Sequence, residues 1–122
     1  MVRSLNNLGG LHTEEDFHNQ NTIFSDTLIS NYKNFNIHQC PPNGPGLVVH
    51  LMMKLLQKFN WNNLNYIDPM RFHIQAEVSK VCFEIKETVL GDPKFNKIDI
   101  DYLMSSESID KLFKKINLDK VY

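Results

Sequence analysis

Two cysteines and five histidines are the first side chains of this 122-residue sequence to consider as a nucleophile, a base or metal ligands. Cys40 has one plausible base nearby, His38, because side chains two residues apart on a strand share a face. Cys82 lies beside the apolar stripe of a predicted helix, where a thiol usually serves as inert packing. A Cys–His hydrolase is therefore one hypothesis, and it requires that replacing Cys40 abolishes an esterase or amidase activity.

The spacing of the histidines argues against a metal site. None forms an H-x-H or H-E-x-x-H pattern, and the five are His12, His18, His38, His50 and His73. Only His73 and Glu77 fall four residues apart on one face of a predicted helix, whereas zinc needs three or four ligands. We expect this pair to form a hydrogen bond on a polar helix edge, and we expect neither a metal nor another cofactor.

A proline- and glycine-rich loop, Pro41-Pro42-Asn43-Gly44-Pro45-Gly46, precedes a predicted helix, where backbone N–H groups can bind an anion. Pro45 removes one of those donors, and the loop carries neither a Walker lysine nor a G-x-G-x-x-G pattern. The favoured interpretation is a stiff turn, and the anion cradle is the alternative.

Composition and charge exclude several classes of partner. The formal net charge of −1 gives no broad attraction for nucleic acid or for an anionic membrane surface. The longest apolar run, 47–53, is far shorter than the ~20 residues that span a bilayer. Two cysteines without C-x-x-C spacing favour reduced thiols, and the start of the sequence as written lacks a signal peptide, which favours a cytoplasmic location.

The elements that position these side chains are predicted to be mostly helical. Helices are expected at about 13–20, 47–59, 69–90 and 106–116, with one β-hairpin at about 27–40. Thr13 and Asp16 resemble a capping box, Asp68 and Pro69 open the longest helix, and Ser105 or its neighbour opens the last one. The chain is therefore predicted to be a single α+β unit, 1–122.

Apolar residues at three- and four-residue spacing mark the faces expected to form one core. They are Leu47, Val48, Leu51, Met52, Leu55 and Phe59 in the second helix; Ile74, Val78, Val81 and Ile85, with Ala76 and Cys82 beside them, in the third; and Ile109, Leu112, Phe113 and Ile116 in the last.

Three stretches, in this order and spacing, resemble the gamma-glutamyltranspeptidase family. The first is Gly9-Gly10-Leu11-His12-Thr13-Glu14-Glu15-Asp16-Phe17. The second runs from Tyr32-Lys33-Asn34-Phe35 through the double-proline loop to Leu55-Leu56-Gln57-Lys58-Phe59, and the Pro-Pro-Asn-Gly form of that loop is more similar to the amidohydrolase-like relatives. The third is His73, Glu77 and Lys80, leading into Leu90-Gly91-Asp92-Pro93-Lys94-Phe95. Together they resemble an internal piece of the large-subunit region.

The resemblance implies part of an N-terminal-nucleophile hydrolase, an incomplete portion of its αββα sandwich with one hairpin. Family members cleave their own precursor, and the threonine freed at the start of the small subunit attacks the substrate. The implied activity is hydrolysis or transfer of the gamma-glutamyl group of glutathione-like compounds. Thr13, Thr22, Thr27 and Thr88 lack the context of that threonine, so we place it beyond Tyr122 and assign no catalytic, cofactor-binding or metal-binding residue here.

The sequence departs from the family at one pair of positions. Where the family usually has an aspartate and an arginine, this chain has Ile85 and Lys86. The change removes a bidentate ion pair, so packing before the Leu-Gly-Asp-Pro segment is expected to differ.

The resemblance also sets the expected partners, which are the rest of the large subunit and the threonine-bearing small subunit. Because Met1 matches a place inside the large subunit, we expect a truncated frame, a split gene or a cut fragment, and an upstream signal peptide would allow a periplasmic location. Helices 47–59 and 74–89 would then lack the sheets they pack on, expose a large apolar patch and cause self-association. The alternative is a non-catalytic helical binding module or the relic of a truncated gene.

Overall fold

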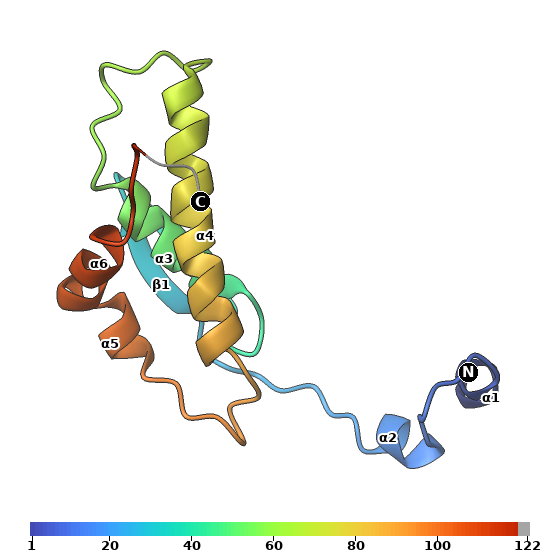
Figure 1. Cartoon of the computed structure of the whole chain (residues 1–122). Helices are drawn as coiled ribbons and strands as arrows, with labels where there is room; N and C mark the ends of the chain where they lie inside the picture. The colour runs from blue at the N-terminus through green and yellow to red at the C-terminus, as the bar shows by residue number, and fades with distance from the viewer. Residues whose placement is uncertain (120–122) are drawn as a thin grey trace.

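The structure, a computed structural model, describes residues 1–119. Its elements in chain order are α1 (Val2–Asn7), α2 (Glu14–His18), β1 (Leu28–Tyr32), β2 (Phe35–Gln39), α3 (Gly46–Leu56), α4 (Pro69–Val89), α5 (Ile100–Met104) and α6 (Ser106–Phe113). Residues 28–119 form a body in which α3 contacts both strands, α4, α5 and α6. Residues 1–27 form an arm that carries α1 and α2 away from this body (Figure 1).

The two strands form an antiparallel hairpin in which Ser30 pairs with Ile37 and Tyr32 pairs with Phe35. The turn residue that adopts the left-handed conformation is Lys33, with φ of 53°. The Lys33 ammonium lies 5.6 Å from the centre of the Tyr32 ring. The hairpin therefore accepts a conformation that is unusual for lysine.

The core lies along α3. Leu51 and Leu55 are completely buried, and α4 packs against them through Val78 and Cys82. The predicted stripes of α3, α4 and α6 supply every buried apolar residue, and their remaining members are partly buried. One predicted position is wrong, because Ala76 is exposed on the opposite face of α4 while the neighbouring Glu77 is buried.

Side chains cap the first turns of four helices. The Thr13 hydroxyl accepts a hydrogen bond from the Asp16 N–H, and the Asp16 carboxylate accepts one from the Thr13 N–H at 2.7 Å, which completes a capping box. The Thr13 hydrogen bonds hold the pKa of Asp16 below its usual value. The side chains of Asp68, Asp99 and Ser105 cap α4, α5 and α6 by accepting one backbone N–H hydrogen bond each, without the reciprocal bond of a capping box.

Several helix ends differ from those expected. The predicted helices 47–59 and 106–116 end at Leu56 and Phe113, because the chain continues beyond both points in turns closed by bonds between residues three apart. The helices at 13–20 and 69–90 are shorter by one to three residues. The short helices α1 and α5 were not predicted, and neither contains a fully buried residue.

The expectation that α3 and α4 would leave their main apolar faces bare is wrong. These faces pack against each other, against the hairpin and against α6. Large apolar side chains are instead exposed on the arm (Leu8, Leu11, Ile23 and Phe24), on the hairpin (Ile29 and Phe35) and around α4 (Tyr66, Ile67, Phe72 and Phe83). Across residues 1–119, no helix combines the length and apolar character needed to cross a membrane.

Candidate functional site

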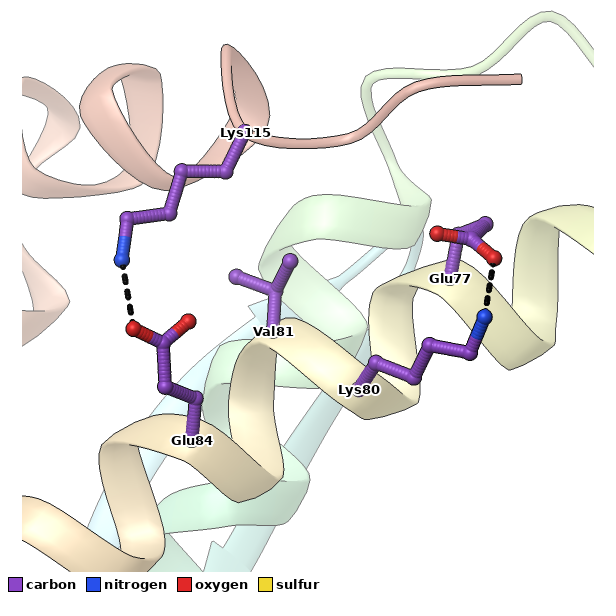
Figure 2. Close-up of a pocket in the computed structure, with 5 residues that line it drawn as sticks. All are labelled: Glu77, Lys80, Val81, Glu84 and Lys115. Carbon is purple, nitrogen blue, oxygen red and sulfur yellow. Dashed lines mark hydrogen bonds and ion pairs between the residues drawn. The ribbon is translucent and has the colours of Figure 1, made fainter. Parts of the chain in front are cut away.

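A charged pocket lies between α4 and the turn that follows α6. It has a volume of about 610 Å³, and Figure 2 shows the five residues that line it. Glu77, Lys80, Val81 and Glu84 come from α4, and Lys115 reaches across from the turn. The buried Val81 side chain lies between two ion pairs, so the pocket has an apolar centre and charged sides (Figure 2).

Each carboxylate in the pocket is paired with a lysine. Glu77 Oε1 lies 2.5 Å from Lys80 Nζ, and Glu84 Oε1 lies 3.0 Å from Lys115 Nζ. The Glu77 side chain is only 4% exposed, so Lys80 compensates a charge that burial would otherwise penalise. The lining contains no hydroxyl, thiol or imidazole group, and its lysines and carboxylates are engaged in ion pairs with one another, so this pocket can hold charged groups but offers no serine-, threonine- or cysteine-type nucleophile.

The expected hydrogen bond between His73 and Glu77 is absent from the described residues. His73 Nε2 donates instead to the backbone carbonyl of Leu118 at 3.1 Å, while Glu77 turns to Lys80. Side chains four residues apart on a helix are neighbours, but here each finds a partner with better geometry. His73 therefore fixes the segment after α6 onto α4.

Among the described residues, Cys40 and His38 form no hydrogen bond with each other, so the Cys–His hypothesis gains no support. His38 Nδ1 lies 3.2 Å from the Thr27 hydroxyl, and Cys40 is exposed without a hydrogen-bonded base in the described residues. Cys82 is fully buried, and burial raises the pKa of its thiol to about 12. Both cysteines are free thiols, as expected from their spacing.

These environments predict very different thiol reactivity. In the folded chain at pH 8, iodoacetamide is expected to modify Cys40 within minutes and to leave Cys82 unmodified, because only thiolates react readily. The measurement is peptide mass spectrometry over time, with a sample in denaturant as the control in which both thiols react. Equal labelling of both residues in the native chain would contradict the buried placement of Cys82.

A buried Ser–His pair was missed by sequence reasoning. The Ser30 hydroxyl and His50 Nδ1 share a hydrogen bond of 2.5 Å that joins β1 to α3. His50 is completely buried and Ser30 is 5% exposed, so no substrate can reach the hydroxyl. His50 Nε2 is buried without a partner among the described residues. The signal was present in the sequence, because His50 falls within the apolar stripe beside Leu47 and Leu51.

His50 makes stability depend on pH. Burial lowers the pKa of His50, an effect that the Leu28 backbone only partly offsets and that the charges of Lys54 and His38 reinforce. The unfolded chain therefore binds more protons than the native chain below about pH 6.5. The stability that comes from keeping His50 neutral is fully present above that pH, and it is lost as the pH falls toward the lowered pKa of His50 in the folded chain.

We therefore expect a lower urea midpoint at pH 5.5 than at pH 7.5, and a smaller difference in a His50→Gln variant. Val49→Ala is the matched control, because it alters the neighbouring residue in α3 without removing a titrating group. It should lower the midpoint similarly at both pH values. A His50→Gln variant with the same pH difference as the parent chain would show that another group is responsible.

Among residues 1–119, no three His, Cys, Asp or Glu side chains are grouped to hold a metal ion. The loop before α3 ends in a buried first turn, which favours its interpretation as a stiff connection. The threonines are dispersed: Thr13 caps α2, Thr27 meets His38, Thr22 lies in the extended part of the arm and Thr88 bonds to a carbonyl of α4.

Comparison with known proteins decides the family. The sequence matches the family profile described as gamma-glutamyltranspeptidase over residues 1–122. The chain belongs to the gamma-glutamyltranspeptidase family. Glutathione hydrolase proenzyme 2 of Schizosaccharomyces pombe is 31% identical to it over 128 residues, which cover 100% of this chain and 20% of that protein. The chain thus spans about a fifth of the length of this curated relative.

Solved structures support the same fold. A gamma-glutamyltranspeptidase from Pseudomonas nitroreducens, complexed with L-DON, superposes with a TM-score of 0.84 at 18% identity, covering 99% of this chain and 37% of that one. The Helicobacter pylori gamma-glutamyltranspeptidase gives a TM-score of 0.81 at 23% identity, covering 93% of this chain and 33% of that one. The helical segment with its two-stranded hairpin is therefore part of the gamma-glutamyltranspeptidase fold.

Proposed function

We propose that these residues are a scaffold segment of a gamma-glutamyltransferase-like enzyme. The enzyme would hydrolyse or transfer the gamma-glutamyl group of glutathione-like substrates through a threonine nucleophile that lies outside these 122 residues. The observation that carries the proposal is the family match along the whole chain. The segment would contribute packed helices and a hairpin to the wall around the site, and the remaining large-subunit region and a small subunit would be its partners.

The side chains support a structural role for this segment. The charged pocket has no hydroxyl or thiol in its lining, the Ser30–His50 pair is buried, and Cys40 has no hydrogen-bonded base in the described part of the chain. An acyl-transfer mechanism needs a nucleophile beside a base, at a place that a substrate can reach. The segment would therefore depend on the rest of the enzyme for its chemistry.

A hybrid enzyme tests the proposal. In this hybrid the matching fifth of the S. pombe relative is replaced by the present 122 residues. Hydrolysis of a chromogenic gamma-glutamyl anilide is measured for the hybrid, for the parent enzyme and for the present chain alone. We expect activity from the hybrid and none from the chain alone.

Two outcomes would contradict the proposal. Hydrolysis by the purified chain alone would place a complete site within these residues. A hybrid that is soluble and cooperatively folded, yet neither cleaves its precursor nor hydrolyses the anilide, would favour a non-catalytic binding module instead. Replacing Cys40 with serine in any active sample separates the Cys–His hypothesis from the threonine mechanism, because only the former predicts loss of activity.

A further inference from the structure

The arm is a defined piece of structure that barely touches the body. Figure 1 shows α1 and α2 at the far end of an extended segment that leaves the body at β1. Within residues 1–119, no hydrogen bond is formed by the backbone of residues 22–26. Such an extended segment can pair with another strand, because its unpaired N–H and C=O groups need hydrogen-bond partners wherever water is excluded.

The same segment carries two large apolar side chains that are almost fully exposed. Phe24 is 94% exposed and Ile23 is 79% exposed. Nearer the amino end, Leu8 and Leu11 are exposed to a similar degree. Scattered exposed apolar residues are ordinary, but adjacent ones on an unpaired extended segment are typical of an interaction surface.

The far end of the arm is nevertheless well organised. The Thr13 capping box fixes the start of α2, and the Gly10 N–H donates to the Leu5 carbonyl at the end of α1. Gly10 has no room for a side chain, since an added Cβ would lie 2.9 Å from the Leu5 carbonyl oxygen. Local bonds therefore shape the tip, whereas nothing in the described body fixes the position of residues 22–26.

We propose that residues 21–27 dock as an added strand on the remainder of the gamma-glutamyltranspeptidase fold, with Ile23 and Phe24, which point to opposite faces of a strand, each covered by apolar residues of that remainder. The inference rests on the proposed function. The superposition on the P. nitroreducens structure spans 99% of this chain, so it includes the arm, and yet this chain amounts to only 37% of that one. The surface on which the arm would dock is therefore formed by the other residues of that fold.

Hydrogen exchange tests this docking directly. In the chain alone, the amides of residues 22–26 should exchange at the earliest time point, as in an unstructured peptide. In the S. pombe hybrid, we expect the same amides to exchange at least roughly a hundredfold more slowly, as paired strands do. Replacing both Ile23 and Phe24 with serine in the hybrid should abolish this protection and lower anilide hydrolysis by roughly tenfold or more, as losing an interface anchor does. Tyr66→Ser, which alters an 80% exposed residue of the body, is the matched control and should change neither result.

Three results would overturn the inference. Protection of residues 22–26 in the monomeric chain would show that the arm packs on its own body. Protection that rises with the concentration of the chain alone would assign the arm to a second copy. An active hybrid whose arm amides are unprotected would refute the docking and would leave the proposed function unchallenged. Failure of the proposed function would look different, because the folded hybrid would then lack hydrolysis even with the unmodified arm.

Discussion

Replacing Leu51 with alanine is expected to lower the free energy of unfolding by about 3 kcal/mol, within the range of about 2–5 kcal/mol found for buried leucines. Leu51 is completely buried in α3, the helix that contacts every other element of the body. The substitution removes apolar surface from the core and leaves a cavity that the neighbouring helices fill only partly. The measurement is urea unfolding followed by circular dichroism.

Leu11→Ala is the matched control for Leu51→Ala. Leu11 is 94% exposed in the arm, so the same chemical change should alter the free energy of unfolding by less than about 0.5 kcal/mol. Equal losses in the two variants would show that α3 is not the centre of the folded chain.

Gly46→Ala is expected to destabilise the chain by about 2 kcal/mol, although alanine normally favours a helix over glycine by about 1 kcal/mol. An added Cβ at Gly46, the first residue of α3, would lie 2.5 Å from the Cys40 carbonyl oxygen and 2.8 Å from Gln39 Cβ. Both atoms belong to the chain at the end of β2, so relief requires movement of the backbone. Overpacking of this kind outweighs the gain in helix propensity.

A second glycine in the same loop provides the control. At Gly44 an added Cβ would have only the Pro41 carbonyl oxygen nearby, at 3.9 Å, so Gly44→Ala should be close to neutral. Urea midpoints of the two variants measure the difference. A stabilising effect of Gly46→Ala would mean that α3 and the end of β2 are farther apart in solution than the structure places them.

Features that depend on neighbours in sequence were predicted well from the sequence. The caps at Thr13, Asp68 and Ser105 are local hydrogen bonds, and each lies at a helix start in the structure. The apolar stripe of α3 was also evident, because a period of three to four residues reports one buried face. The family followed from ordered motifs and is confirmed along the whole chain.

Features that depend on distant residues were not predictable in this way. The Ser30–His50 bond joins two elements twenty residues apart, and neither residue type alone predicts burial. Glu77 replaces Ala76 in the α4 interface because Lys80 compensates its charge, which hydropathy does not register. The short helices α1 and α5 were missed because neither is long enough to show a period. The threonine nucleophile and the subunit partners stay predictions.

The pairing of elements that follow one another along the chain affects how the polypeptide folds during its synthesis. β1 pairs with β2 directly along the chain, and α3 then packs on the hairpin before it and on α4 after it. Contacts between elements that follow one another form quickly, because only short loops must close. We therefore expect the body to become compact soon after its last helix leaves the ribosome, so that in the enzyme proposed above it would meet the remaining residues as a preformed surface.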